Sequence, residues 1–317
     1  MTEGKSNASI DSIIGRKQSF WSYFTSHYLL YFMLLAPILY YTLFHYGPMS
    51  GLLIAFKNYN MFRGIWASEW AGFDVFREVF RMPEFFRSIR NTLTLNILDL
   101  VLGFPAPIIL ALMLNELVNG KFKKAIQTIL YMPHFLSWVI IGGMTYQIFA
   151  TNSGIINAVL NDLIRVKIPF LTNSYWWIFT YFLIGLWQSV GFSAIIYMAA
   201  ISSIDQEIYE AARVDGCSRF RMMWQITLPC IASTVVIMFI LQVGSMASIG
   251  FEKPLMLGNT TVYSVSDVLS TFVYRVGVVN ARFSIGTAIG LVQSVVNFLL
   301  VMCANMLSNR ISGESLW

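Results

Sequence analysis

Charged residues are scarce in this sequence. Only 12% of its 317 residues are Asp, Glu, Lys or Arg, whereas 56% are hydrophobic, and the mean hydropathy is +0.63. A soluble globular domain carries roughly twice that charged fraction, about 25%. A soluble chain this apolar would expose large hydrophobic patches and aggregate. The composition therefore excludes an ordinary soluble enzyme and indicates an integral membrane protein.

Residues that build metal centres, disulfides and catalytic sites are also few. The cysteines Cys217, Cys230 and Cys303 have no metal-ligand spacing and fall in or beside apolar segments, so we interpret them as small buried residues. The three histidines are scattered, and the sequence contains no recognisable Ser/His/Asp set and no phosphate-binding G-x-x-x-x-G-K-[ST] loop. We therefore expect no catalytic residue, no metal and no cofactor in this chain. No basic–aromatic run suggests nucleic-acid binding.

Long hydrophobic runs, in contrast, are abundant. A helix needs about 20 mostly apolar residues to cross roughly 30 Å of hydrocarbon. Six runs meet this requirement, and we predict spans over residues 28–46, 91–117, 125–149, 175–200, 226–249 and 283–307. The first should end at Gly47-Pro48, and Gly103, Pro105 and Pro107 should kink the second. The predicted fold is all-α integral membrane, with six transmembrane helices between tails at residues 1–27 and 308–317.

An even number of spans places both tails on one side of the membrane. If that side is the cytoplasm, the Lys and Arg residues divide almost evenly between the two sides, so their number alone decides nothing. The short loop Asn119–Lys124 contains three lysines, and the tail contains Arg16-Lys17. Both features favour cytoplasmic termini, because short basic loops stay inside. On the outer side, the segment Asp74–Phe80 is predicted to form an amphipathic helix on the membrane surface.

The segment 202–229, between spans four and five, is polar yet patterned. Ser203 followed by Gln206 predicts a capping box at the start of one helix. Asp215-Gly216 predicts a turn at its end, and Ser218 is positioned to cap a second helix. The pattern therefore predicts a helix–turn–helix hairpin on one membrane face, with Glu210 exposed.

The residues of this hairpin also match a known sequence signature. Glu210-Ala211-Ala212, then Gly216 after three residues, then Ile226-Thr227-Leu228-Pro229 after nine, resembles the EAA signature of ABC importer permeases. The resemblance implies a cytoplasmic loop that docks on a separate ATPase, and it favours cytoplasmic termini. Small alanines would let the helix pack closely, and glycine would permit the turn. The coupling residues implied are Glu210, Ala211, Ala212, Asp215, Gly216, Leu228 and Pro229.

The resemblance extends over nearly the whole chain. Further segments are similar to the polysaccharide-type carbohydrate permeases, which include importers of alginate or pectic rhamnogalacturonan oligosaccharides. These segments are Tyr46–Met49 with Gly51–Lys57, Phe104–Pro107, Tyr131–Trp138 and Gly250–Pro254. This family implies a bacterial inner-membrane location and a second homologous permease. It also implies two copies of a cytoplasmic ATPase that hold ATP and Mg, and an external solute-binding protein. The outer loop Gly250–Arg282 is where that protein should dock.

Polar residues within the predicted spans are candidates for contact with a transported sugar. Such residues are costly in hydrocarbon and therefore face either a pathway or another helix. The candidates are Asp99, Trp187, Gln188, Tyr197, Gln242, Ser245, Glu252, Gln293 and Asn297. For each of them, hydrogen bonding between helices is the alternative role.

We therefore expect a permease subunit that translocates an oligosaccharide by alternating access, driven by a partner ATPase. The predicted outer loops carry more basic than acidic residues, which favours an acidic substrate derived from alginate or pectin. Two alternatives remain open at this point. One is an ABC permease for a non-sugar solute such as a peptide, and the other is a membrane-embedded protein or enzyme outside the ABC class.

Overall fold

The structure, a computed structural model, describes residues 26–312, and the chain divides into two compact units, residues 1–53 and 54–317. The first unit contains α2 (Tyr28–Tyr41), η1 (Thr42–Tyr46) and most of η2 (Gly47–Phe56). These form one helical run that continues to Phe56. The predicted end at Gly47-Pro48 is wrong, because Pro48 lies in the first turn of the 3-10 helix η2, where its missing N–H is tolerated.

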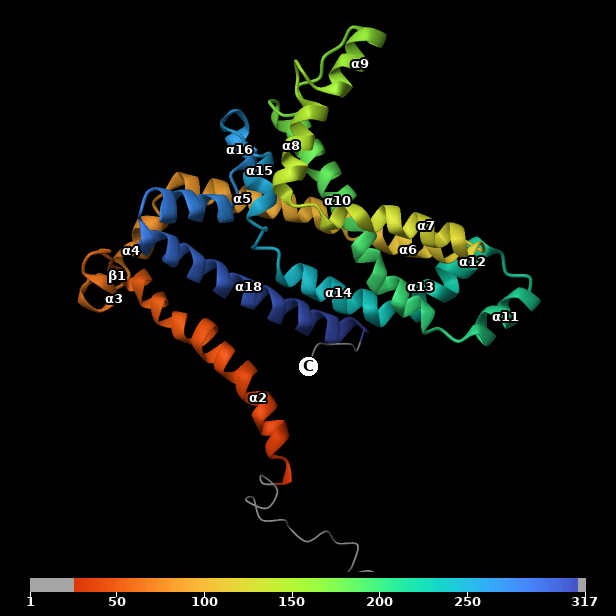
Figure 1. Cartoon of the computed structure of the whole chain (residues 1–317), viewed down its shortest axis with the longest axis horizontal. Helices are drawn as coiled ribbons and strands as arrows, with labels where there is room; N and C mark the ends of the chain where they lie inside the picture. The colour runs from red at the N-terminus through yellow and green to blue at the C-terminus, as the bar shows by residue number, and fades with distance from the viewer. Residues whose placement is uncertain (1–25, 313–317) are drawn as a thin grey trace, which may run out of the picture. The chain divides into compact units, whose positions relative to one another are not determined.

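The described part of the second unit is almost entirely helical (Figure 1). Its described strands, β1 and β2, have two residues each and pair antiparallel. In chain order its elements are β1 (Lys57–Asn58), α3 (Gly64–Ala67), β2 (Glu69–Trp70), α4 (Asp74–Val79), α5 (Pro83–Leu98), η3 (Asp99–Gly103), α6 (Pro105–Asn115), α7 (Gly120–Tyr131), η4 (Met132–Phe135), α8 (Trp138–Phe149), α9 (Ile155–Ile164), α10 (Ser174–Ser202), α11 (Gln206–Val214), α12 (Arg219–Met222), η5 (Met223–Thr227), α13 (Leu228–Cys230), α14 (Ala232–Gly244), α15 (Glu252–Leu257), η6 (Thr260–Val262), α16 (Tyr263–Ser266), α17 (Leu269–Val273), η7 (Tyr274–Val279) and α18 (Phe283–Ser312).

Four described helical runs are long and apolar enough to cross a membrane: Tyr28–Phe56, Pro83–Asn115, Ser174–Ser202 and Phe283–Met306. Two bent helix pairs bring the number to as many as six if each pair is one span. The second predicted span begins earlier than Asn91, at Pro83 in the first turn of α5. The π-helical turn η3 follows α5, and Pro105 and Pro107 then open α6 without breaking the run.

The third and fifth predicted spans are bent rather than continuous. Between η4 and α8 the chain turns by 101°, because Leu136 and Ser137 have extended backbone. The Ser137 hydroxyl then caps α8. Between α13 and α14 the bend is 66°, and it falls at Ile231, just after Pro229. Proline cannot donate the helical hydrogen bond, which favours a break at this point. The predicted spans 125–149 and 226–249 each contain one of these bends, for which the sequence analysis made no prediction.

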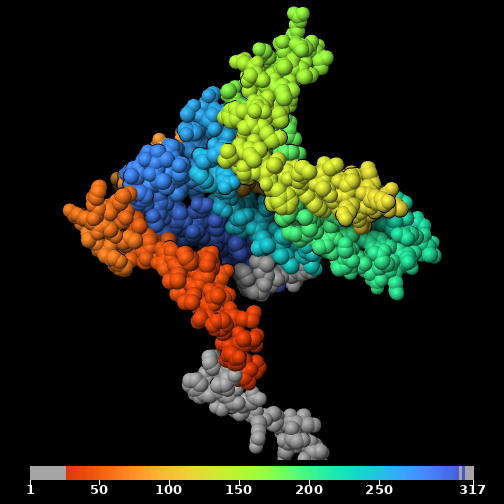
Figure 2. All heavy atoms as spheres, in the orientation of Figure 1, coloured from red at the N-terminus to blue at the C-terminus, as the bar shows by residue number. Residues whose placement is uncertain are grey.

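Helix α10 is the central element of the second unit. It packs against α6 and α7 on one side and contacts η4 and α14. Gly191 makes the approach to α7 possible, since a methyl group there would overlap the backbone carbonyl of Leu130. Helix α14 packs along α18, and α15 packs on α8. Figure 2 shows α8 and α9 projecting from the rest of this unit.

A buried ion-pair cluster fixes the segment after α15 against α5. The Asp267 carboxylate is 1% exposed, forms an ion pair with Arg275, and lies 3.5 Å from the Arg87 guanidinium. Asn91 on α5 donates a hydrogen bond to the Asp267 carbonyl at 3.0 Å. These contacts hold the segment α15–α17 in a fixed position beside α5.

The cysteines differ from their prediction. Cys230 and Cys303 are exposed and Cys217 is half-buried. A cysteine on an apolar helix is not necessarily buried, because the outward faces of these helices are also apolar. Phe298 and Leu299 on α18, for example, are 62% and 53% exposed.

Candidate functional site

A polar cavity of about 640 Å³ lies beside the first half of α10. Helix α10 contributes Tyr181, Gly185, Gln188 and Ser189, at positions i, i+4, i+7 and i+8, which share one face of a helix. The other lining residues are Leu95, Asn96, Asp99, Trp138, Ser248, Ile249, Gly250, Phe251, Glu252 and Lys253. The cavity volume is within the range typical of small-molecule sites, about 300–1,000 Å³.

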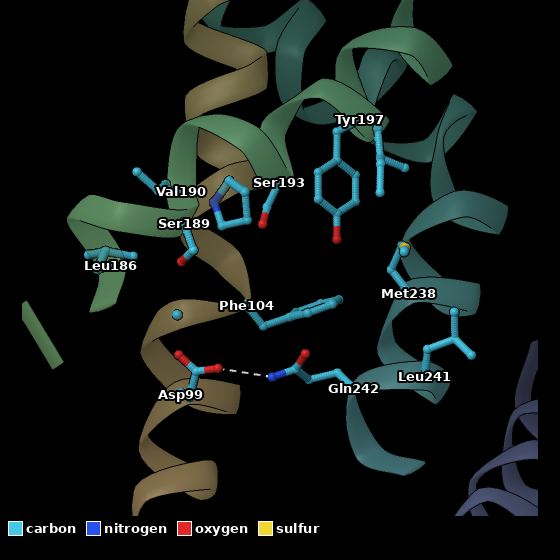
Figure 3. A pocket seen from close by; sticks show the side chains of 13 residues that line it. Asp99, Phe104, Leu186, Ser189, Val190, Ser193, Tyr197, Met238, Leu241 and Gln242 are labelled. Atoms are coloured by element: carbon cyan, nitrogen blue, oxygen red, sulfur yellow. Dashed lines mark hydrogen bonds between the residues drawn. The ribbon is translucent and has the colours of Figure 1, made fainter. Parts of the chain in front are cut away.

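A second cavity of about 250 Å³ continues along the same helix. It shares Asp99 and Ser189 with the first cavity and is also lined by Phe104, Tyr197 and Gln242 (Figure 3). The Asp99 carboxylate accepts a hydrogen bond from the Gln242 amide at 3.0 Å, which joins η3 to α14. In Figure 3 the Tyr197 hydroxyl points into the cavity toward this pair. The two cavities together form a polar cleft along α10.

Lys253 brings a positive charge to the wall of the larger cavity. Its ammonium lies 3.8 Å from the centroid of the Tyr181 ring and 5.7 Å from that of Trp138. The absence of a side chain at Gly185 leaves room for the ammonium, since a methyl group built there would overlap it. Desolvation lowers the pKa of Lys253 to about 8, and the charge of Asp99 acts in the opposite direction.

Five of the predicted sugar-contact residues line this cleft: Asp99, Gln188, Tyr197, Gln242 and Glu252. The remaining four lie elsewhere. Trp187 is 42% exposed on another face of α10, and the Ser245 hydroxyl donates to the Gln242 carbonyl at 2.9 Å. Gln293 borders a small apolar cavity beside α5. The Asn297 side chain accepts a hydrogen bond from the Ala247 backbone at 3.2 Å, so it joins α18 to the chain after α14.

The sequence reasoning missed Lys253, Tyr181 and Ser189. A signal for the last two was present, because Tyr181 precedes Gln188 by two helical turns and Ser189 precedes Tyr197 by about two turns, so each lies near the helical face of a predicted residue. No comparable signal pointed to Lys253. Its inward position depends on the packing of α15 against α8, which links segments distant in the sequence.

The predicted hairpin contains α11, α12 and the turn between them. Helix α11 begins after Asp205, whose carboxylate accepts a hydrogen bond from the Glu207 backbone N–H at 3.0 Å. The predicted capping box at Ser203 is wrong, because α10 continues to Ser202 and the Ser203 hydroxyl donates to the Ala200 carbonyl at 2.7 Å. The cap predicted at Ser218 is confirmed, since its hydroxyl accepts from the Arg221 backbone N–H.

Gly216 ends α11 in the left-handed region, with φ of +74°. The Cys217 N–H bonds the Ala212 carbonyl at 2.9 Å, and the Gly216 N–H bonds the Arg213 carbonyl at 3.1 Å. These two bonds form a Schellman motif, in which glycine is the favoured residue at the left-handed position. Ala212 and Cys217 also pack together in one apolar cluster. The spacing between the alanine pair and the glycine is therefore the spacing of a helix terminus.

The hairpin is anchored on one side and exposed on the other. Tyr209 and Thr227 share a buried hydrogen bond of 3.0 Å between their hydroxyls, and Ala212 and Met222 are buried with them. Glu210, Ala211, Asp215 and Gly216 are exposed. Leu228 packs against the buried cluster that joins α6 to α10 and includes Tyr197, while Pro229 is exposed. The exposed face of α11 is thus available to a partner.

Comparison with known proteins gives consistent matches. Residues 86–313 match the model of a family described as "Binding-protein-dependent transport system inner membrane component". The chain is 43% identical to protein LplB of Bacillus subtilis over 288 residues, which cover 91% of each chain. It is 42% identical to the polygalacturonan/rhamnogalacturonan transport system permease protein YteP of the same organism, over 91% of this chain and 90% of YteP.

Solved structures agree with these matches. A chain of the bacterial alginate ABC transporter, in complex with an alginate pentasaccharide-bound periplasmic protein, superposes with a TM-score of 0.86 at 40% identity. The match covers 94% of this chain and 99% of that chain.

Proposed function

The chain belongs to the family of binding-protein-dependent transport system inner membrane components, and from this premise we propose that it is the permease subunit of an ABC importer for an oligosaccharide. In this role α11 docks on a cytoplasmic ATPase subunit, and the polar cleft along α10 forms part of the sugar pathway. The subunit moves between outward-open and inward-open states as the ATPase closes and opens.

One observation carries this proposal: the cleft and the hairpin are parts of one packed structure. Helix α10 lines both cavities from Tyr181 to Tyr197 and ends at Ser202, a few residues before α11. Leu228, at the far end of the hairpin, packs in the same cluster as Tyr197. A displacement of the hairpin therefore acts on the wall of the cleft through direct contacts, because packed interiors transmit strain.

The partners follow from this role. We propose a second, homologous permease, two copies of the ATPase that bind ATP and Mg²⁺, and an external solute-binding protein. The transporter lies in the bacterial inner membrane with both termini in the cytoplasm. We propose six spans, with each bent pair counted as one span, and α11 on the cytoplasmic side between the fourth and the fifth. The outer loop Gly250–Arg282 docks the solute-binding protein.

The substrate is proposed to be an acidic oligosaccharide from pectin or alginate. The names of two relatives support this class, since one concerns polygalacturonan and rhamnogalacturonan and the other concerns alginate. The lining of the cleft supports a sugar substrate, whether acidic or neutral, because it combines amide and carboxylate groups with the rings of Trp138, Phe104 and Tyr197. Sugars, like other ligands, are oriented by a few placed polar groups in an otherwise apolar or aromatic site.

ATP-coupled uptake in proteoliposomes tests the coupling role of α11. The complex of this chain with its partner subunits is reconstituted with the solute-binding protein loaded with labelled trigalacturonate. Glu210→Ala is expected to reduce uptake at least tenfold, because it removes an exposed charge that we assign to the ATPase contact. Glu207→Ala, one turn earlier on the same exposed helix, is the matched control and should keep uptake. Equal effects of the two substitutions would refute the assignment.

A further inference from the structure

Lys253 places an unpaired ammonium in the larger cavity. Among the residues that the structure describes, no carboxylate lies within 4.0 Å of this ammonium. In this part of the chain it lies over the rings of Tyr181 and Trp138 and beside Gly185. An ammonium group has three N–H donors, and an aromatic face satisfies a cation without accepting all of them. The cavity therefore contains a cation with unused capacity to bind an anion.

The position of this ammonium is built into the fold. Tyr181 is 5% exposed and stacks on the buried Trp177 ring, with the two centroids 4.9 Å apart. Trp177 in turn donates a hydrogen bond to the Leu257 carbonyl at 2.8 Å, on the helix that carries Lys253. One chain of contacts thus fixes α15, the aromatic platform and the ammonium relative to one another.

The remaining charges of the cavity are negative and belong to Asp99 and Glu252. Asp99 is tied to the Gln242 amide, while Gln188 and Asn96 add amide groups to the lining. Carboxylates and amides suit the hydroxyl groups of a sugar, whereas an ammonium suits a carboxylate. The two acids repel a carboxylate, and among the lining residues Lys253 alone carries a positive charge that offsets this repulsion. The cavity thus offers one place for a negative group and several for hydroxyl groups.

Resting on the proposed function, we propose that Lys253 binds the carboxylate of a uronate unit in the transported oligosaccharide, and that it makes this cavity selective for an acidic sugar unit over its neutral counterpart. Lys253 is then a specificity-determining residue, whereas Tyr181 and Gly185 position it.

The test measures binding to the purified transporter, made of this chain and its partner subunits, by calorimetry without the solute-binding protein. The two probes are trigalacturonate and the neutral galactose trisaccharide obtained by reducing its carboxyl groups. The wild-type transporter should prefer the acidic probe by about ten- to a hundredfold, which corresponds to one charge-assisted hydrogen bond. Lys253→Gln should abolish this preference and leave the affinity for the neutral probe unchanged.

Two further variants separate specificity from folding and from net charge. Lys253→Arg keeps the positive charge and should retain a preference for the acidic probe. Lys167→Gln removes an exposed lysine outside the cavity and should leave both affinities unchanged. If Lys253→Gln weakens both probes equally, Lys253 only supports the packing on Tyr181, and the inference is overturned.

Uptake measured in parallel distinguishes this inference from the proposed function. ATP-coupled uptake together with an acid preference that survives Lys253→Gln would overturn the inference and leave the importer role standing. An acid preference that depends on Lys253, in a transporter that shows no ATP-coupled uptake, would support the binding site and overturn the proposed function.

Discussion

The φ of +74° at Gly216 allows a prediction of how the hairpin responds to substitution. A non-glycine L-residue in the left-handed region costs roughly 1–2 kcal/mol, and asparagine is better tolerated there than other residues. A Cβ atom added at Gly216 would meet no other atom within 4 Å. Any penalty therefore comes from the backbone conformation alone, and the size of the side chain should matter little.

We predict that Gly216→Val destabilises the terminus of α11 by about 1–2 kcal/mol, whereas Gly216→Asn costs a few tenths. This energy corresponds to a factor of about 5–30 in the local opening equilibrium. Hydrogen exchange followed by mass spectrometry should show faster exchange by that factor at the Gly216 and Cys217 amides, which close the Schellman motif. Exchange in α18 serves as the internal reference.

ATP-coupled uptake should follow the same order, with wild type and Gly216→Asn similar and Gly216→Val reduced. Two results would refute this reasoning. One is equal exchange in the valine and asparagine variants, which would show that backbone strain does not govern the turn. The other is unimpaired uptake in a valine variant whose hairpin exchanges faster, which would remove the hairpin from coupling.

Three further predictions rest on single contacts. Tyr209→Phe removes the hydroxyl that is hydrogen-bonded to Thr227 at 3.0 Å and should destabilise the hairpin by about 0.5–1.5 kcal/mol. Hydrogen exchange of the α11 amides should become faster while exchange in α10 stays unchanged. Unchanged exchange in α11 would mean that this bond does not anchor the hairpin. Trp177→Phe leaves the buried Leu257 carbonyl without the indole N–H that donates to it at 2.8 Å, which should destabilise the protein by about 1–3 kcal/mol. The Tm should fall by more than it does for the control Trp176→Phe, because Trp176 is 38% exposed. Equal falls in Tm would show that the Trp177 hydrogen bond does not stabilise the fold. Because the pKa of Lys253 is lowered to about 8, its ammonium predominates below that pH, so the preference for trigalacturonate should decline as the pH rises through about 8. Asp99, Glu252 and Tyr181 face the same group, and Lys253→Gln should show no such decline; an identical decline in that variant would assign the effect to one of these neighbours.

The all-helical fold and the hairpin were predictable because each depends on local sequence. Apolar runs of sufficient length identify spans without knowledge of their neighbours, and Ser218 caps a helix by contacts within three residues. Gly216 likewise fulfils a requirement that is set within one turn. Ser203 failed as an N-cap because it is the C-cap residue of α10, where its hydroxyl donates to the Ala200 carbonyl, and Asp205 caps α11 instead.

The bends and the cleft were less accessible to sequence reasoning. Hydropathy reports whether a segment is apolar but not whether its axis turns, so the bends at Leu136 and Ile231 were missed. Polar residues in spans were equally good candidates for a cavity or for helix contacts. Packing alone separates Gln242, which lines the cleft, from Asn297, which bonds the Ala247 backbone. Lys253 lies in the cleft because α15 packs on α8. Hydrophobic periodicity within one segment gives no information on such contacts between distant segments.

In the proposed importer, α11 is the contact between this permease and its ATPase. The most direct measurement is site-specific photocrosslinking in native membranes, with a photoreactive residue at position 210 or, as a control, at position 66, where Trp66 is 78% exposed in the predicted outer segment. If α11 makes this contact, position 210 gives an adduct with the ATPase subunit and position 66 gives none. An ATPase adduct from position 66, or none from position 210 in membranes where uptake is active, would contradict it.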